Sequence, residues 1–477
     1  MTDRNLPQDP LVERYASRRM LELFSAERRI RQWRAVWIAL AEAQAQLGLP
    51  ITRAQIAQMR RAAPRVNWKV AERIERRIRH DVMAHVKAFA VQCPKAAPII
   101  HLGATSALVT DNADLVIMRE GLEVLLGRTL AAIGRLSRFA RRHKDAPTMS
   151  YTHLQPATPT TVGKRACLWL QDLVMDAQEL ERRLAGLRAL GAKGATGTQE
   201  TFVELFGGNK NKARRLDKIF AAKLGFKQVL GVSGQTYTRK IDHQILAALS
   251  GVAQSAAKFG NDVRLLQGFG EMSEGFGAEQ VGSSAMPYKR NPMKSERLVS
   301  LARYVMNLEA SAAATAAAQW LERTLDDSAV RRLTIPGAFL ATDAVLVLYA
   351  DVVSGLEVAE GKIAARLAEN LPFMAAEAIL MAAAKSGADR QDLHERLRVH
   401  SQGAWTRMRA GGGNDLVERL KADPSFKGAR KLLAKPLEPE RFTGRAAEQV
   451  EEFISGTVEP LLARRRKLIL EPQRVRI

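Results

Sequence analysis

Apolar side chains recur at spacings of three and four residues along most of this chain, which is the pattern of helices that bury one face. The first clear run extends from Glu27 to Leu47. Five longer runs follow, and they predict helices over about Asp114–Phe139, Pro159–Leu190, Ile241–Leu266, Met293–Trp320 and Ser328–Leu356. We expect Gly234-Gln235-Thr236 to open the third of these helices. Long helices that each carry an apolar stripe are typical of a bundle.

The predicted fold class is all-α, in three domains. We expect an N-terminal helical domain over residues 1–105, a central domain of five long helices over 106–358 and a C-terminal helical domain over 359–477. Beyond residue 360 the helical patterns shorten, and Pro372 and Gly411-Gly412-Gly413 interrupt them. A length of 477 residues, with 46% hydrophobic and 26% charged residues, fits a soluble protein of more than one domain.

Composition excludes several other classes of protein. The longest apolar stretches, near Ala344–Val353, fall short of the roughly 20 residues that a membrane span needs, so no membrane association is predicted. Cys93 and Cys167 are the only cysteines, too few for a disulfide framework and without the grouped spacing of a zinc site. A reducing cytoplasm is therefore the predicted location.

The formal net charge of +23 leaves two kinds of partner open. A nucleic-acid-binding protein would use such a charge to displace counterions. The basic residues are spread along the chain, however, and the densest run, Arg464–Lys467, has the character of a solvated helix end. A positive field also attracts a small substrate that carries phosphate and carboxylates, so charge alone does not separate the two hypotheses.

The most distinctive polar segment is Gly282-Ser283-Ser284-Ala285-Met286-Pro287-Tyr288-Lys289-Arg290-Asn291-Pro292. It follows a glycine-rich stretch, where the backbone bends at low steric cost. Adjacent hydroxyls, an ammonium, a guanidinium and an amide suit the binding of an anion better than a hydrophobic core. By composition alone, an ordinary surface loop explains the segment equally well.

Two histidines lie in surroundings that suit acid–base chemistry. Arg79-His80-Asp81 places one between a cation and an anion, within a helical pattern that continues to Phe89. The other is His153, in a polar turn before the second long helix, where Thr152 and Gln155 are available to fix its tautomer. The ordinary alternatives are a surface ion pair for His80 and a loop histidine that satisfies backbone carbonyls for His153.

Two further places suit an anion. Thr105 and Ser106 precede a predicted helix that Thr110 or Asp111 would cap, and unpaired N–H groups at a helix start favour a carboxylate or phosphate. At the junction of the last two long helices, two guanidiniums and a hydroxyl make a phosphate cradle from Arg323, Ser328 and Arg332. Salt bridges from these arginines to Asp326 and Asp327 are the alternative.

The segment at Gly282 resembles the signature loop of the fumarase/aspartase superfamily of lyases, whose pattern is Gly-Ser-Ser-x-Met-Pro-x-Lys-x-Asn. With Tyr288 and Arg290 it is similar to the variant of the adenylosuccinate lyase family. The other polar strings match that family as well, and the resemblance extends from about Arg14 to Arg445.

This resemblance implies a β-elimination that releases fumarate from a succinylated amine, with no metal or organic cofactor. It assigns the general base to Ser283 and the general acid to His153, with His80 orienting or assisting and Lys289 stabilising the dianionic intermediate. The substrate-binding positions that it carries over are Arg14, Tyr15, Arg79, Asp81, Thr105, Ser106, Gln235, Asn291, Arg297, Arg323, Ser328 and Arg332. The implied substrates are adenylosuccinate, which yields AMP, and the succinylated aminoimidazole carboxamide ribotide of purine synthesis.

The superfamily also implies a homotetramer, in which the five long helices of each chain form a twenty-helix core and each active site draws on three chains. Candidate residues that range from Arg14 to Arg332 are too dispersed along long antiparallel helices to meet within one chain. Argininosuccinate lyase or fumarase is the nearest alternative, and the phosphate cradle argues against both. A non-catalytic, nucleic-acid-binding relative is a further alternative, which the intact His153 and Ser283 disfavour.

Overall fold

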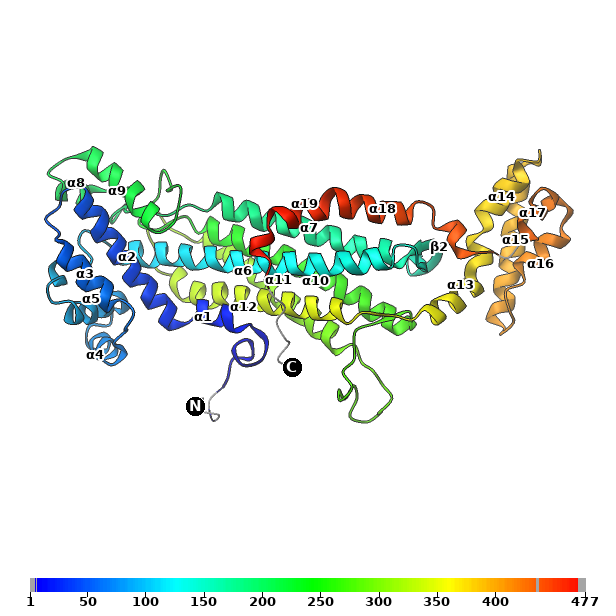
Figure 1. Cartoon of the computed structure of the whole chain (residues 1–477), viewed down its shortest axis with the longest axis horizontal. Helices are drawn as coiled ribbons and strands as arrows, with labels where there is room; N and C mark the ends of the chain where they lie inside the picture. The colour runs from blue at the N-terminus through cyan, green and yellow to red at the C-terminus, as the bar shows by residue number, and fades with distance from the viewer. Residues whose placement is uncertain (1–4, 6, 435–436, 471–477) are drawn as a thin grey trace.

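The computed structural model describes residues 5, 7–434 and 437–470, which form a long helical rod (Figure 1). Five long helices run along it: α6 (Ser106–Arg142), α7 (Val162–Gly186), α10 (Lys240–Phe269), α11 (Met293–Ala317) and α12 (Asp327–Ser354). Their apolar stripes meet in one continuous core, in which α10 packs on α11 and α11 on α12. The predicted all-α class is confirmed.

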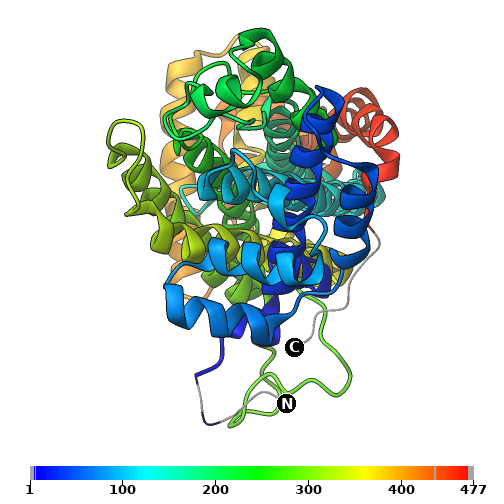
Figure 2. The ribbon, with the colours of Figure 1, turned by 90° about the vertical axis from the view of Figure 1, so that its left-hand side faces the viewer.

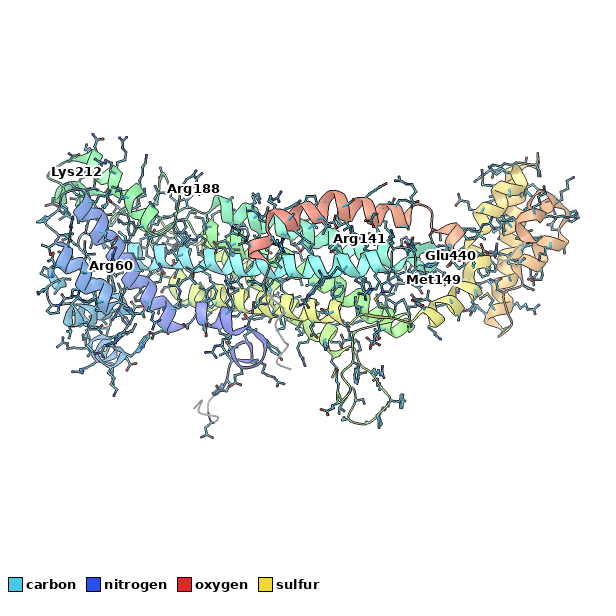
Figure 3. The ribbon with its side chains drawn as sticks, viewed as in Figure 1. Arg60, Arg141, Met149, Arg188, Lys212 and Glu440 are labelled. Carbon is cyan, nitrogen blue, oxygen red and sulfur yellow. The ribbon has the colours of Figure 1, made fainter. Side chains whose placement is uncertain are left out.

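Short helices cover one end of this bundle, as the end-on view in Figure 2 shows. They are α2 (Ala26–Gln46), α3 (Arg53–Ala62), α4 (Trp68–Ile78), α5 (Asp81–Gln92), η2 (Ala97–Ile99), α8 (Glu200–Leu205) and α9 (Lys210–Lys223). Before them in the chain, η1 (Leu11–Tyr15) and α1 (Arg18–Leu23) pack against α12. Arg60 of α3 and Lys212 of α9 mark this end in Figure 3.

The opposite end carries a hairpin of β1 (Pro147–Thr152) and β2 (Gln155–Thr161), near which Met149 and Glu440 are labelled in Figure 3. A second small sheet pairs β3 (Met272–Ser273) with β4 (Glu357–Val358). Beyond it come α13 (Glu360–Met374), α14 (Ala376–Ala384), α15 (Arg390–Arg409), α16 (Leu416–Ala422), η3 (Pro424–Ala429), α17 (Arg430–Leu433) and η4 (Pro439–Phe442). Helices α14 to α17 enclose a separate small core.

The last described helices return along the rod beside α6 and α7 (Figure 1). They are α18 (Ala446–Phe453), η5 (Ile454–Val458), α19 (Glu459–Arg464) and η6 (Arg466–Leu468). The domain limits near residues 105 and 358 stay a prediction.

The start of α6 differs from the prediction. The helix begins at Ser106, and the Oγ1 of Thr105 accepts the N–H of Leu108 at 3.1 Å as its cap. The prediction that Thr110 or Asp111 caps the helix is wrong. Asp111 is buried within α6 because its carboxylate serves a tertiary ion pair with Arg239.

The segment before α7 is a hairpin rather than a polar turn followed by helix. Helix α7 therefore starts at Val162, later than the predicted Pro159, and it ends at Gly186 instead of Leu190. Both strands contain several threonines, whose branched side chains favour extended backbone.

Two other predicted helices begin later than expected. Helix α10 begins at Lys240 because the preceding segment is irregular and buries Tyr237 and Arg239. The helical pattern from Arg79 to Phe89 is also broken, since Arg79 has a left-handed φ of 52° and ends α4. Helices α11 and α12 match their predicted ranges to within a few residues.

Two helical stretches of the described residues, Asp327–Ser354 and Glu360–Ala384, are long and apolar enough to cross a membrane by length and composition. In the first, which is α12, 78% of the apolar window is buried inside the protein, as in the core helix of a bundle. The second is divided into α13 and α14 at Ala375.

Candidate active site

His80 and Ser106 meet where α5 and α6 begin. His80 caps α5, and its Nδ1 accepts the N–H of Met83 at 3.4 Å. In the neutral ring this pattern assigns the proton to Nε2, which then donates to the Oγ of Ser106 at 3.4 Å. Both side chains remain open to solvent, so the pair lies at the surface of the rod's N-terminal end.

Asp81 connects this pair to α12. Its carboxylate forms an ion pair with the Arg332 guanidinium at 2.8 Å. Burial by itself raises the pKa of the Asp81 carboxyl, but the Val82 N–H and the Arg332 guanidinium outweigh burial and hold that pKa below its usual value. Asp81 is therefore an anion near neutral pH, available to hold Arg332 in place.

The predicted phosphate cradle lines one pocket. Arg323, Ser328 and Arg332 all border a cavity of about 130 Å³ between α12, α6 and the first helices of the chain. The salt bridges considered as the alternative also form in part, since Nη1 of Arg323 lies 3.0 Å from Oδ1 of Asp327. The arginines are thus held by carboxylates and still face the pocket.

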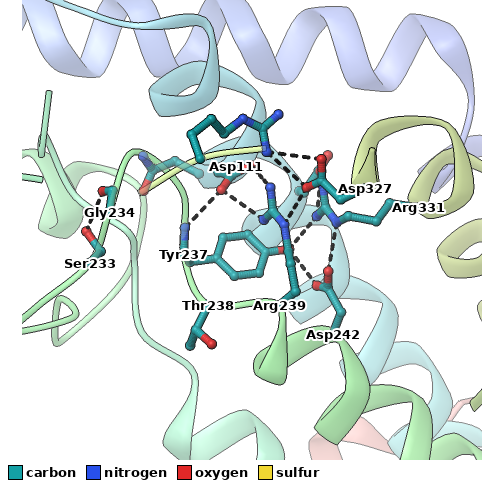
Figure 4. Close-up of polar contacts among 12 residues, drawn as sticks. Asp111, Ser233, Gly234, Tyr237, Thr238, Arg239, Asp242, Asp327 and Arg331 are labelled. Carbon is teal, nitrogen blue, oxygen red and sulfur yellow. Dashed lines mark hydrogen bonds and ion pairs between the residues drawn. The ribbon is translucent and has the colours of Figure 1, made fainter. Parts of the chain in front are cut away.

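A buried network of charges supports this wall of the pocket (Figure 4). Asp327 shares its carboxylate between Arg323 and Arg239, whose Nε lies 2.7 Å from Oδ2. Arg239 in turn forms two hydrogen bonds to Asp111 at 2.9 and 3.1 Å. Burial raises the pKa of Asp327, but the two guanidiniums lower it further, so its carboxyl stays ionised.

A second guanidinium in the same network joins three helices. Arg331 of α12 donates to Asp242 of α10 at 2.7 Å and to Asp114 of α6 at 3.1 Å (Figure 4). The hydroxyl of Tyr237 donates to Asp242 at 2.6 Å. Sequence analysis missed this network, although charged residues that interrupt apolar stripes at these positions were a usable signal.

Gln235 lies beside the same pocket wall but not in a helix. Its N–H donates to the carbonyl of Glu322 at 3.0 Å, and its side-chain amide donates to the carbonyl of Ala195 at 3.1 Å. A Cβ on Gly234 would lie 2.5 Å from the Glu322 oxygen, so this close backbone approach requires glycine. The backbone contact with Glu322 thus holds the segment that contains Gln235 against the segment that contains Arg323.

The signature loop projects from the side of the rod between β3 and α11 (Figure 1). Its neck is closed by Asn291, whose amide donates to the carbonyl of Gly282 at 2.7 Å. Within the loop, the Oγ of Ser283 accepts the N–H of Met286 at 3.1 Å. Lys289 is exposed, and its backbone lies beside Gly282 at the neck.

His153 lies at the hairpin tip. With Leu154 it forms a two-residue turn in which both φ angles are positive, 53° and 59°, as the twist of a tight hairpin requires. The ring is exposed, and among the described residues no hydrogen bond joins it to Thr152 or Gln155. The partners expected to fix its tautomer are therefore not supplied by this turn.

Tyr15 and Arg297 form a third group, midway along the bundle. The Arg297 guanidinium carbon lies 6.0 Å from the centre of the Tyr15 ring. Tyr15 and the exposed Arg14 belong to η1, which packs on α12.

The predicted site residues thus fall into separate groups within one chain. Most of them gather at the N-terminal end of the rod, near α5 and the pocket. The hairpin with His153 lies at the other end, as the positions of α5 and β2 in Figure 1 make clear. No single chain brings His80 and His153 to one small substrate.

Comparison with known proteins first defines the class. The sequence profile of the Lyase family matches residues 3–307, well over half of the chain. The chain therefore belongs to this family, and it is a lyase.

A second profile, described as the adenylosuccinate lyase C-terminus, matches residues 372–453. Adenylosuccinate lyase of Schistosoma mansoni is 47% identical over 458 residues, which cover 95% of this chain and 95% of the relative. Adenylosuccinate lyase of Saccharomyces cerevisiae is 46% identical over 468 residues and 97% of both chains. Within the lyases, this chain belongs to the adenylosuccinate lyase family.

Solved structures share the fold. The 3-carboxy-cis,cis-muconate lactonizing enzyme of Pseudomonas putida superposes with a TM-score of 0.81 at 24% identity, over 95% of this chain and 99% of that one. Fumarate lyase of Mesorhizobium sp. BNC1 gives 0.80 at 23% identity, over 94% and 100%. At these identities the likeness concerns the architecture alone.

Proposed function

We propose that this lyase eliminates fumarate from adenylosuccinate to give AMP, and from the succinylated aminoimidazole carboxamide ribotide by the same chemistry. The observation that carries the proposal is one continuous arrangement at the N-terminal end of the rod. There His80 bonds Ser106, while the adjacent Asp81 holds Arg332 at 2.8 Å on the wall of the pocket. A succinylated nucleotide presents both a reactive arm and a phosphate to such a site.

The reaction needs one base and one acid. In the proposed mechanism Ser283 takes the proton from the carbon beside a carboxylate, the carbon–nitrogen bond breaks, and His153 protonates the departing nitrogen. Lys289, Asn291, Thr105 and Ser106 stabilise the intermediate, which carries extra negative charge on its carboxylate. The projecting loop is placed to close over a bound substrate, with Ser283 near its neck.

The remaining predicted positions bind substrate in this proposal. Arg323, Ser328 and Arg332, which line the pocket, hold the phosphate, and Arg14 and Tyr15 contribute to holding it. Arg79, Asp81, Gln235 and Arg297 contact the rest of the nucleotide and its succinyl arm.

We further propose a homotetramer with shared sites, which the same geometry supports. Exposed apolar side chains lie along the outer faces of the long helices, namely Leu168 and Met175 of α7, Leu265 of α10, Tyr304 of α11 and Leu333 of α12. Such faces suit packing between copies of the chain. Antiparallel copies would bring the hairpin of one chain to the N-terminal end of another. The proposed location is the cytoplasm.

An assay with the purified full chain tests the proposed function. Loss of absorbance on incubation with adenylosuccinate, together with formation of AMP and fumarate, is expected. Argininosuccinate serves as the control substrate, because it carries the same succinyl arm without a phosphate. Turnover of argininosuccinate but not of adenylosuccinate would refute the proposal.

A further inference from the structure

Five arginines line the pocket beside Ser328, and four of them have carboxylate partners. Arg239 and Arg323 pair with Asp327, Arg331 pairs with Asp242 and Asp114, and Arg332 pairs with Asp81. The carboxylates that line the pocket are likewise all engaged, since Asp111 bonds Arg239. The fifth arginine is Arg29, near the start of α2.

Arg29 differs from its neighbours on α2. Arg28 pairs with Glu120 at 2.8 Å and Arg31 pairs with Glu27 at 2.9 Å, whereas no described carboxylate forms an ion pair with Arg29. Its Nε is buried and has no hydrogen-bond partner among the described residues. A buried donor left without a partner costs on the order of 1 to 3 kcal/mol, and a charged one costs more.

Trp33, one turn further along α2, lines the same pocket. Its indole Nε1 is also buried without a partner in the described part of the chain. The Arg29 guanidinium carbon lies 5.8 Å from the centre of the Trp33 ring, so the two side chains are neighbours. The guanidinium of Arg29 therefore borders the pocket beside the Trp33 ring, with no ion-pair partner among the described residues.

The pocket has room for a phosphate group. Its volume of about 130 Å³ is several times the roughly 10–15 Å³ that a single water needs on the same measure. Because its own carboxylates are neutralised by the other four arginines, the free charge of Arg29 is available to such an anion.

We propose that Arg29 is a further ligand of the substrate's phosphate group, reaching it from α2 while Arg323, Ser328 and Arg332 reach it from the α12 side. The proposal rests on the proposed function and extends it, because Arg29 belongs to none of the motifs noted in the sequence.

Arg29→Met tests the proposal, because methionine keeps the length of the side chain and removes its charge. KM for adenylosuccinate should rise by about tenfold to a hundredfold, the worth of one charge-assisted hydrogen bond, while kcat changes by less than about threefold. The inhibition constant of inorganic phosphate should rise by a similar factor. Arg29→Lys, which keeps the charge, should recover part of both losses.

Arg31→Met is the matched control, since Arg31 lies on the same helix and pairs with Glu27 outside the pocket. It should leave KM and phosphate inhibition unchanged. The ligand-free Arg29→Met protein should unfold at the wild-type temperature or above it, because the substitution removes a cation without a partner. A marked drop in that temperature, or unchanged KM and phosphate inhibition, would overturn the proposal.

Failure of the proposed function can be distinguished from failure of the proposed role of Arg29. If the wild-type protein turns over neither succinylated nucleotide, the proposed activity is refuted. Phosphate binding can then be measured without turnover, as the rise in unfolding temperature that inorganic phosphate produces. That rise should be lost in Arg29→Met and retained in Arg31→Met. Equal rises in both variants would refute the role of Arg29.

Discussion

Arg323 precedes α12 and Asp327 is its first residue, and Nη1 of the arginine is 3.0 Å from Oδ1 of the aspartate. Asp327 is almost fully buried, while Arg323 is partly open to the pocket. The other oxygen of the same carboxylate bonds the buried Arg239 at 2.7 Å. The position of Arg323 in the pocket is thus tied to a buried network of charges.

Removing the charge of Asp327 should lower both the stability of the protein and its affinity for substrate. Asp327→Asn keeps the shape of the side chain but leaves two guanidiniums without its charge, so the free energy of unfolding should fall by about 3 kcal/mol. KM for adenylosuccinate should rise about tenfold as Arg323 loses its fixed orientation. Urea unfolding and steady-state kinetics measure the two effects. Asp326→Asn, at the exposed neighbouring position, should change neither, and equal effects of the two variants would contradict the assignment.

Mixing of subunits should show whether the proposed acid, His153, and the proposed base, Ser283, act from different chains of one site. His153→Ala and Ser283→Ala should each lower turnover at least a thousandfold, because each removes a proton-transfer group while leaving its exposed backbone in place. If sites are shared between chains, a mixture of the two inactive variants should regain part of the activity after dissociation and reassembly. Near-wild-type rates in either variant, or a tetramer that fails to form in sizing experiments, would contradict the assignment.

The two ends of the signature loop meet at its neck, and their close approach there should require a glycine at position 282. A Cβ there would lie 2.2 Å from the Lys289 carbonyl oxygen, so Gly282→Ala must displace the returning strand of the loop. Since displacements of about 1 Å at a reacting group cost on the order of a hundredfold in rate, kcat/KM should fall by about that factor. The unfolding temperature should change little, because the loop projects from the core.

Gly277→Ala is the control for this substitution, because the nearest atom to its Cβ would be 3.6 Å away, at an ordinary contact distance. It should retain activity within about twofold. An active Gly282→Ala enzyme would mean that the shape of the neck does not govern catalysis.

Asp176 on α7 should make the protein less stable as pH rises. Burial raises the pKa of its carboxyl to about 7, which a hydrogen bond from Ser255 opposes and the nearby Asp172 reinforces. Between about pH 4 and pH 7 the unfolded chain has already lost this proton while the folded chain keeps it, so the folded state is progressively disfavoured.

Asp176→Asn should therefore stabilise the protein at pH 8 by roughly 2 kcal/mol and have little effect at pH 4. Unfolding in urea at the two pH values measures the difference. Glu179→Gln, on the same helix, should not stabilise at pH 8, because burial raises the Glu179 pKa but Arg182 and Arg183 lower it further. A stabilisation of Asp176→Asn that is independent of pH would contradict this account.

Much of the fold was predictable from local pattern. The ranges of α2, α11 and α12 follow apolar spacing closely, because a helix that buries one face must repeat apolar residues every three or four positions. Errors arose where polar residues inside an element have distant partners. Asp111 suggested a helix cap, whereas it lies within α6 and bonds Arg239, which is far away in the sequence.

The sequence alone determined the long amphipathic helices, the residue types available for acid–base chemistry and, through the signature loop, the family. The tertiary structure decided that Asp81 holds Arg332, that Asp327 divides its charge between two arginines and that Arg29 borders the same pocket with no ion-pair partner among the described residues. It also decided that the hairpin bearing His153 lies at the far end of the rod from His80. The physical reason is that apolar periodicity is a property of neighbouring residues, whereas the partner of a buried charge is set by which helices pack together.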